Sequence, residues 1–523
     1  MNLLALQTVL PDVNFLIILP EVIVAGIAVA VMLVDAFVAS KQRWITGSIS
    51  LLGLVAAALA CVWLWGGGTS SSTADFNNMI VVDGMRLSFT LVFLLVSSLT
   101  ILISMVWIEA DNLPAGEFHS LLMFATCGMM LMASGNDLVI IFLGLEILSI
   151  ATYVMAGFRR SDLRSNESSL KYFVLGSFSS AILLYGIALV YGATATTSGL
   201  PGTTNIMLIA ARLGESRYPA LLFAGVAMML VGFGFKVATA PFHVWTPDVY
   251  EGAPTPVTAF MAAGPKAAGF ASFLRVFVFG FPFVVATGTA MSVDVRIHTA
   301  WLTTLGVLAI VTMTVGNVVA IVQNNVKRML AYSSIAHAGY ALVGFVAAGA
   351  ASDAAKRNEA LAAVAFYMLT YAVMNLGAFA VVTMIAQTGD RRTEVEDYNG
   401  IGFRAPVLSF TLSIFLLSLL GLPLTAGFMG KIMVFRSALD MGYYLLVTIG
   451  VINTAVSAYY YLRLIIVMFF RERTTAWTAP VIPAGIAIAL VITVIGTFYL
   501  GLFPGRILDV FRKIPITSSR VGR

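Results

Sequence analysis

Apolar runs of about 20 residues, separated by short polar loops, recur along the whole chain. A helix of about 20 apolar residues is long enough to cross the hydrocarbon core of a bilayer. The pattern therefore predicts an all-α polytopic membrane protein with about fourteen transmembrane helices. We place them at residues 15–34, 44–65, 87–107, 118–134, 138–157, 168–191, 219–240, 255–279, 298–322, 328–349, 360–386, 406–430, 442–469 and 480–502.

The first apolar run, 15–34, carries Glu21 and lacks the basic leader and small-residue cleavage site of a secretory signal peptide. We therefore expect this helix to be retained.

Two weak sequence matches indicate an internal repeat. Residues 149–158 line up with 336–345, and residues 239–242 line up with 425–428 at nearly the same offset. The members of each pair lie five predicted helices apart, and because five is odd the two copies must have opposite orientations in the membrane. Inverted repeats with interrupted helices are typical of membrane transport units, whose sites lie near the midplane.

Predicted helices 7 and 12 are discontinuous at corresponding places, at Pro241 and at Gly421-Leu-Pro423. Proline frees backbone groups that only protein or trapped water can satisfy inside a membrane. The repeat and its breaks divide the chain into four parts: an N-terminal three-helix segment at 1–115, a first inverted five-helix repeat (helices 4–8) at 116–280, a second (helices 9–13) at 297–470, and a last helix with its tail at 471–523.

Composition excludes several classes of function. The chain is 59% hydrophobic and 11% charged, whereas about 25% charged residues is ordinary for a soluble domain. Basic residues stand singly or in pairs between the helices, so the net charge of +5 does not indicate a nucleic-acid surface. Cys61 and Cys127 are too few to hold an iron–sulfur cluster or zinc, and no G-x-G-x-x-G fingerprint is present. We therefore expect no cofactor on this chain, and any redox chemistry must take place on other chains.

The distribution of basic residues predicts the orientation. Cytoplasmic loops are enriched in lysine and arginine, so we expect both termini to lie outside the cytoplasm. The basic C-terminal tail beyond Arg506 argues against this orientation. The loops assigned to the cytoplasm carry Lys41, Arg43, Arg159, Arg160, Arg164, Lys327, Arg328, Arg391, Arg392, Arg404, Arg471 and Arg473.

Four ionisable residues stand inside the predicted helices: Glu146 in helix 5, Lys236 in helix 7, Lys266 in helix 8 and Lys431 at the end of helix 12. A charge at a helix centre costs about 2.5–3.5 kcal/mol on insertion scales, and such residues usually line substrate or ion pathways. The alternatives are a carboxylate that only holds helices together, for Glu146, and lysines that reach the membrane surface, for the others. Of the four residues, Lys431 is the one whose depth in its predicted helix gives the weakest indication of a functional role inside the membrane.

Together these charges suit a proton relay. Burial lowers the pKa of a lysine, and a neighbouring carboxylate raises it again. A lysine that gains and loses a carboxylate partner can therefore take up and release a proton near neutral pH. His243 and His337 could extend such a path, because imidazole titrates near neutrality. A structural role is the alternative for both histidines.

The stretch around Lys236 resembles a known family. The sequence reads Lys236, then Pro241-Phe-His243-Val-Trp-Thr-Pro-Asp-Val-Tyr-Glu-Gly-Ala-Pro-Thr-Pro256, then Lys266. It closely resembles the antiporter-like membrane subunits of respiratory complex I, and among them the chain N and mitochondrial subunit 2 family. The similarity covers nearly the whole chain and is most specific in this stretch.

The resemblance implies a role for each matching residue. Glu146 and Lys236 would pair, Lys266 would link two half-channels, and Lys431 would exchange protons with the outer side. It also implies a multi-pass subunit of the bacterial inner membrane. Its partners would be the neighbouring antiporter-like and small subunits of the complex, with flavin, iron–sulfur clusters and quinone held by partner subunits.

The implied function is proton translocation within NADH:quinone oxidoreductase, driven by quinone reduction on partner chains. The alternative is a subunit of a multi-subunit sodium/proton antiporter, which shares the motif. A membrane scaffold without transport is a third possibility. Residues 245–256 suit the first function best.

Overall fold

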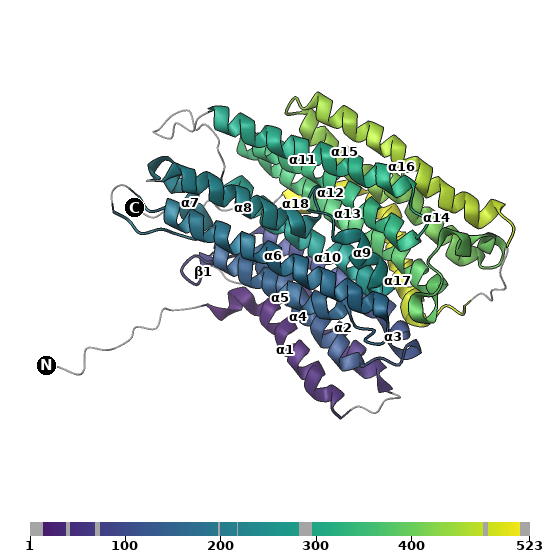
Figure 1. Cartoon of the computed structure of the whole chain (residues 1–523). Coiled ribbons are helices and arrows are strands. Elements are labelled where there is room, and N and C mark those ends of the chain that lie inside the picture. Colours follow the sequence, from purple (N-terminus) through teal and green to yellow (C-terminus); the bar gives the residue numbers. More distant parts are fainter. Residues whose placement is uncertain are drawn as a thin grey trace.

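The computed structural model describes residues 14–37, 42–67, 74–196, 199–216, 218–281, 295–473 and 480–512. Lys41 and the tail beyond Arg512, both used for the orientation, lie outside these residues. The helices run side by side in one bundle, with α1 and α2 along one side and α11 and α16 along the other (Figure 1). The α-helices are α1 (Leu19–Asp35), α2 (Trp44–Trp65), α3 (Gly84–Ala110), α4 (Ala115–Ser134), α5 (Leu138–Ala156), α6 (Leu163–Ala193), α7 (Ile206–Arg212), α8 (Pro219–Val237), α9 (Thr246–Gly252), α10 (Thr255–Leu274), α11 (Val295–Ile321), α12 (Val326–Ala350), α13 (Ala354–Ala386), α14 (Pro406–Leu420), α15 (Ala426–Leu439), α16 (Tyr444–Phe470), α17 (Ala484–Leu502) and α18 (Pro504–Arg512).

The prediction of an all-α polytopic membrane protein is confirmed. Among the described residues the only strands are the short pair β1 (Ala74–Asp75) and β2 (Ile80–Val81). Within the described ranges, twelve helices are each long and apolar enough to cross a membrane. The two remaining predicted helices correspond to α10 and to the broken pair α14–α15. The count of fourteen crossings stays a prediction.

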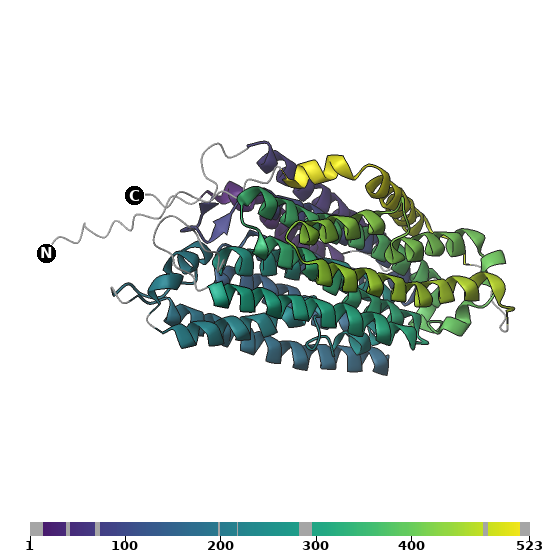
Figure 2. The ribbon, with the colours of Figure 1, turned by 90° about the horizontal axis from the view of Figure 1, so that it is seen from above.

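Helix α10 and its neighbours form the centre of the bundle. Every residue of α10 is buried, although it contains Lys266 and Pro265. Helices α12 and α13 are also largely buried, and α10 contacts α3, α4 and α13. In contrast, α2, α5, α6 and α16 expose apolar stripes, as expected of surfaces that face lipid or other subunits. Seen from above, the helices remain roughly aligned (Figure 2).

Both discontinuous helices lie where the sequence predicts them. Helix α8 ends at Val237, four residues before Pro241, and Ala238 takes the left-handed backbone conformation with φ 59°. Helix α14 ends at Leu420, where Gly421 has φ 97°. A left-handed residue directly after a helix is a common helix terminator, because its N–H bonds back to the last free carbonyls.

The two halves of the chain share one local feature at matching places. Asp137, which caps α5, forms an isolated antiparallel bridge with Asn205. Asn325, which caps α12, forms the same kind of bridge with Glu394. The first bridge lies at the start of α5, next to the start of α7. The second lies towards the other end of α5, because Asp390, four residues before Glu394, contacts Arg159 just beyond that end. Copies related by inversion would place the bridges in this way.

Candidate functional site

Lys236 lies in the last turn of α8 with its side chain buried. Its Nζ donates a hydrogen bond to Ser149 Oγ on α5 at 2.6 Å. The same ammonium lies 5.6 Å from the ring centre of Tyr172 and 5.8 Å from that of Tyr153. One hydroxyl and two aromatic faces therefore surround the charge, and ring faces attract a desolvated cation.

Glu146 does not form an ion pair with Lys236 in this structure. Its Oε1 is buried and has no hydrogen-bond partner among the described residues, while the residue as a whole is partly exposed. Ser149 follows Glu146 by three positions on α5, so the two side chains lie on the same face of the helix. The partner of Lys236 and the unpaired carboxylate are therefore neighbours on one helix.

Lys266 projects from the middle of α10 and is 1% exposed. Its Nζ donates to the carbonyl oxygen of Ser334 at 2.6 Å and also contacts the Ser334 hydroxyl. The ring centre of Tyr371 lies 5.9 Å from the same nitrogen. The alternative of a lysine that reaches the membrane surface does not apply to this residue, because its ammonium is held inside the bundle.

His337 follows Ser334 by one helical turn on α12 and is buried among tyrosines. Its Nδ1 lies 2.6 Å from the Tyr367 hydroxyl, and its Nε2 lies 3.4 Å from the Tyr461 hydroxyl. The imidazole ring also packs on Tyr371, with ring centres 4.9 Å apart. Both ring nitrogens thus have hydroxyl partners, so this histidine can accept a proton on one side and release one on the other.

Lys431 is held by the break between α14 and α15. Its Nζ donates to the carbonyl oxygens of Leu419 and Leu420 at 3.0 and 2.9 Å. These are carbonyls of the last turn of α14, which have no partner within the helix and carry the negative end of its dipole. The ammonium also lies 4.7 Å from the ring centre of Tyr340, which packs edge-on against His337.

His243 lies apart from this line. It follows the break after α8, is partly exposed, and its Nδ1 has no hydrogen-bond partner among the described residues. The structure therefore brings His337, but not His243, into contact with the tyrosines beside Lys266 and Lys431.

Trp245, within the family motif, packs against the aromatic residues beside Lys236. Its ring stacks on Tyr172 at 4.6 Å and on Phe235 at 5.1 Å, and its Nε1 donates to the Phe235 carbonyl. Because Tyr172 also faces Lys236, the motif positions the aromatic wall of the lysine site.

Sequence reasoning missed the hydroxyl groups of the site. A search for charges in apolar runs cannot find serine and tyrosine, which are common in membrane helices and often bond only to their own backbone. The one available signal was that six tyrosines occur in the apolar segments around the charges. The hydroxyl-bearing residues are Ser149, Tyr153, Tyr172, Ser334, Tyr340, Tyr367, Tyr371 and Tyr461.

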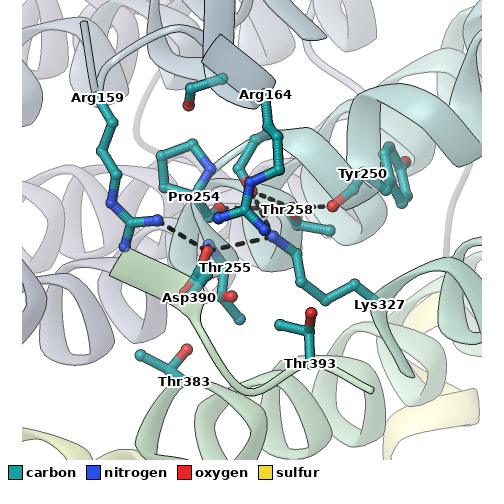
Figure 3. A network of polar contacts seen from close by, with 12 residues as sticks. Arg159, Arg164, Tyr250, Pro254, Thr255, Thr258, Lys327, Thr383, Asp390 and Thr393 are labelled. Carbon is teal, nitrogen blue, oxygen red and sulfur yellow. Dashed lines mark hydrogen bonds and ion pairs between the residues drawn. The ribbon is translucent and has the colours of Figure 1, made fainter. Parts of the chain in front are cut away.

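A buried ion cluster lies at the end of the bundle assigned to the cytoplasm (Figure 3). Arg159 contacts Asp111 at 2.5 Å and Asp390 at 3.1 Å, and Lys327 contacts Asp390 at 3.2 Å. Burial alone would raise the pKa of Asp390, but the charges of Lys327 and Arg159 outweigh it and hold the pKa below its usual value. Lys327 also donates to the Ala253 carbonyl at 2.5 Å, so the cluster ties α12 to the loop before α10.

Two further buried ion pairs lie at the other end of α3. Arg86 donates to both carboxylate oxygens of Glu21 at 2.8 Å, and Arg275 donates to both oxygens of Asp83 at 2.8 and 2.9 Å. Arg86 and Arg275 stand at the ends of apolar runs, where a lysine or arginine usually reaches water, so the sequence does not reveal that they are buried. Among the described residues, no three His, Cys, Asp or Glu side chains are placed to hold a metal ion.

Comparisons with known proteins show the family of the chain. The family model "NADH:quinone oxidoreductase/Mrp antiporter, TM" matches residues 135–457. An NADH-quinone oxidoreductase subunit N from Trichlorobacter lovleyi is 45% identical over 95% of this chain and 96% of its own length.

Solved structures show the same relationship. A chain of respiratory complex I from Thermus thermophilus has a TM-score of 0.74 and 34% identity, over 94% of this chain and 98% of that chain. A chain of the Mrp complex from Dietzia sp. has a TM-score of 0.77 at 19% identity, over 95% of this chain and 96% of that chain, which shows a shared fold. The matched region contains Glu146, Lys236, Lys266 and Lys431, and the chain belongs to the NADH:quinone oxidoreductase/Mrp antiporter transmembrane family.

Proposed function

We propose that this chain is a proton-translocating membrane-arm subunit of an NADH:quinone oxidoreductase, and that Glu146, Lys236, Lys266 and Lys431 carry the protons. The observation that carries the proposal is the set of buried lysines and hydroxyl groups described above, in which contacts connect Lys266 to Lys431 through His337 and its tyrosines. The chain acts as part of a translocase, with quinone reduction on partner subunits as the source of energy.

The second half of the relay is the best connected. Lys266 bonds to Ser334, and His337 lies one turn further along α12 with its ring on Tyr371, which also faces Lys266. Tyr340 then lies between His337 and Lys431. His337, whose two ring nitrogens both meet hydroxyl groups, is the proposed carrier of a proton from Lys266 towards Lys431. The rings of Tyr371 and Tyr340 hold the two ammonium groups close to it but carry no proton themselves.

The first half depends on the choice of partner for Lys236. This lysine is bonded to Ser149 while Glu146 is unpaired. Pairing with Glu146 would stabilise the charged lysine, and returning to Ser149 would favour loss of its proton. A shift of two pKa units corresponds to about 2.7 kcal/mol, which is comparable with the roughly 2.3 kcal/mol needed to move one charge across 100 mV.

The wider assignment follows from the same relatives. Flavin, iron–sulfur clusters and quinone would reside on partner subunits, and the direct partners would be neighbouring antiporter-like and small subunits of the membrane arm. The bacterial relatives support a multi-pass position in the cell inner membrane. Basic residues at one end, including Arg159 and Lys327, support a cytoplasmic location for that end, with both termini outside.

The internal division into two inverted repeats is part of this proposal. The bridges Asp137–Asn205 and Asn325–Glu394, towards opposite ends of α5, support it. So do the left-handed helix terminations at Ala238 and Gly421, which interrupt one helix in each copy. The alternative function, a subunit of a sodium/proton antiporter, has the shared fold in its favour, but the 45% identical relative is an oxidoreductase subunit.

Proton pumping by the assembled complex tests the proposal. Membrane vesicles that contain the Lys266→Ala complex should oxidise NADH but acidify their lumen at least about tenfold more slowly than wild type. The matched control is Lys356→Ala, because Lys356 is exposed at the start of α13. Normal acidification by an assembled Lys266→Ala complex would refute the relay, and sodium efflux insensitive to complex I inhibitors would favour the antiporter.

A further inference from the structure

A groove at the cytoplasm-assigned end of the bundle lies outside the proton relay. It has a volume of about 310 Å³ and lies between α2, α3, α4 and the start of α17. Its deep wall is apolar and includes Leu51, Leu102, Met105 and Val106. Its mouth is polar and includes Arg43 and Glu109.

The groove runs from polar to apolar along the helix axes. Arg43 directly precedes α2, and Leu51 lies eight residues further on, which corresponds to about 12 Å of helix. Glu109 is the second-last residue of α3, and Leu102 lies seven residues deeper. A phospholipid in a bilayer has the same arrangement, with its charged head group at the end of the helices and its acyl chain alongside them.

Trp44 at the mouth indicates the depth of this end in the membrane. It is the first residue of α2, lines the groove and is largely exposed. Tryptophan is enriched at the level of the lipid head groups, because its ring is apolar and its N–H is polar. The mouth of the groove therefore lies where head groups are found.

His119 adds a polar side chain to the wall of the groove. It lines the groove and is 1% exposed, yet its Nε2 has no hydrogen-bond partner among the described residues. The Thr46 hydroxyl donates to the Arg43 carbonyl and lies 3.1 Å from His119 Nδ1. Because the Thr46 hydroxyl already donates its hydrogen to the Arg43 carbonyl, His119 Nδ1 must donate to the hydroxyl oxygen. In that tautomer Nε2 carries no hydrogen and is a free acceptor. This nitrogen has almost no accessible surface, so it makes the wall of the groove more polar but is not open to a bound molecule.

The mouth offers charges of both signs. Arg43 and Glu109 both border the groove, and neither has an ion pair within 4 Å among the described residues. We propose that the groove binds one zwitterionic phospholipid with a primary ammonium head group, that is, phosphatidylethanolamine. Arg43 binds its phosphate, Glu109 accepts hydrogen bonds from its ammonium, and one acyl chain lies against Leu51 and Leu102.

Photolabelling of the intact complex tests this assignment. The complex is placed in nanodiscs with phosphatidylethanolamine that carries a diazirine in one acyl chain, and the labelled peptides are mapped after irradiation. Label is expected on α2, α3 and the first turns of α17. Phosphatidylglycerol with the same modified chain, and a neutral isoprenoid with a diazirine, are the competing probes.

Two variants separate the tail contact from the head-group contacts. Leu51→Trp fills the groove and should abolish the label, whereas Leu59→Trp, on an exposed part of α2, should not change it. Glu109→Gln should lower labelling by phosphatidylethanolamine about fivefold, as expected for one interfacial ion pair, and leave phosphatidylglycerol unaffected.

Several results would overturn the proposal. These are an unlabelled groove in the wild-type complex, unchanged labelling in Leu51→Trp, and stronger labelling by the isoprenoid or phosphatidylglycerol than by phosphatidylethanolamine. If the Leu51→Trp complex does not assemble, Glu109→Gln decides the question, because this variant should lose the preference for phosphatidylethanolamine over phosphatidylglycerol. None of these readouts depends on proton pumping, so the lipid site and the proposed function can fail separately.

Discussion

Lys236 donates its hydrogen bond to Ser149 at 2.6 Å, and Ser149 stands three residues after the unpaired Glu146 on the same helix. The lysine therefore has a neutral partner and an anionic candidate partner on neighbouring positions. The structure shows the state in which the neutral partner is used. A proton relay needs both states, because a lysine with one permanent partner would have no reason to change its protonation.

Ser149→Ala should leave Glu146 as the only one of the two partners with which Lys236 can pair. The neutral partner is lost, and a hydrogen bond to a charged group contributes about 1.5–3 kcal/mol. We expect NADH-driven acidification in membrane vesicles to fall about tenfold or more, with normal assembly of the complex. Ser98→Ala is the matched control, because the Ser98 hydroxyl bonds only to the carbonyl of Leu94 in its own helix. Equal acidification by the two variants would remove Ser149 from the mechanism.

His337→Gln should interrupt transfer between Lys266 and Lys431. Glutamine keeps a polar side chain beside Tyr367 but cannot take up and release a proton near neutral pH. The variant should assemble and lose at least about tenfold of its acidification rate. His298→Gln provides the control, since His298 stands near the start of α11 and contacts none of the relay tyrosines in any described interaction. If both histidine variants pump normally, protons reach Lys431 by a route that does not include His337.

Hydropathy was enough to predict the twelve long apolar helices among the described residues, because each needs about 20 apolar residues whatever its neighbours are. The burial of Lys236, Lys266 and Lys431 could also be predicted, since lysine is rare in such runs. The hydrogen-bond partners of these lysines could not be predicted. Ser334 meets Lys266 only because α10 packs against α12, and serine at that position has no unusual sequence context. The same holds for Asp390, which reaches Arg159 across more than two hundred residues of chain.

The Asp390 cluster should contribute stability with a defined pH range. Its pKa is held below the usual value, so the folded state favours the charged form. That contribution is fully present above the unfolded pKa of about 3.9 and is lost as the pH falls through the lower folded value. Asp390→Asn leaves Lys327 and Arg159 without their shared partner, and removal of one member of a buried ion pair costs about 3–5 kcal/mol.

Thermal inactivation of the purified complex measures this effect. The Asp390→Asn midpoint should lie below that of wild type by a constant amount between about pH 5 and pH 8, and the gap should narrow only below about pH 4. Asp509→Asn is the control, because the Asp509–Arg512 pair is exposed and such pairs contribute at most about 1 kcal/mol. A gap that closes already at pH 6 would show that Asp390 does not carry the titration.

The break in predicted helix 12 depends on Gly427, at the start of α15. A Cβ at this position would overlap the carbonyl oxygen of Ser418 in α14, and neither atom can rotate away because both are fixed by the backbone. Gly427→Ala should therefore push α15 away from α14 and withdraw Lys431 from the carbonyls of Leu419 and Leu420. We expect a reduced yield of assembled complex, and in the fraction that assembles a proton-pumping rate well below wild type. Gly306→Ala in α11 is the control, because no atom lies within 4 Å of the added methyl group, and it should assemble and pump normally. Normal pumping by Gly427→Ala would mean that the position of Lys431 at the end of α14 is not needed for transfer.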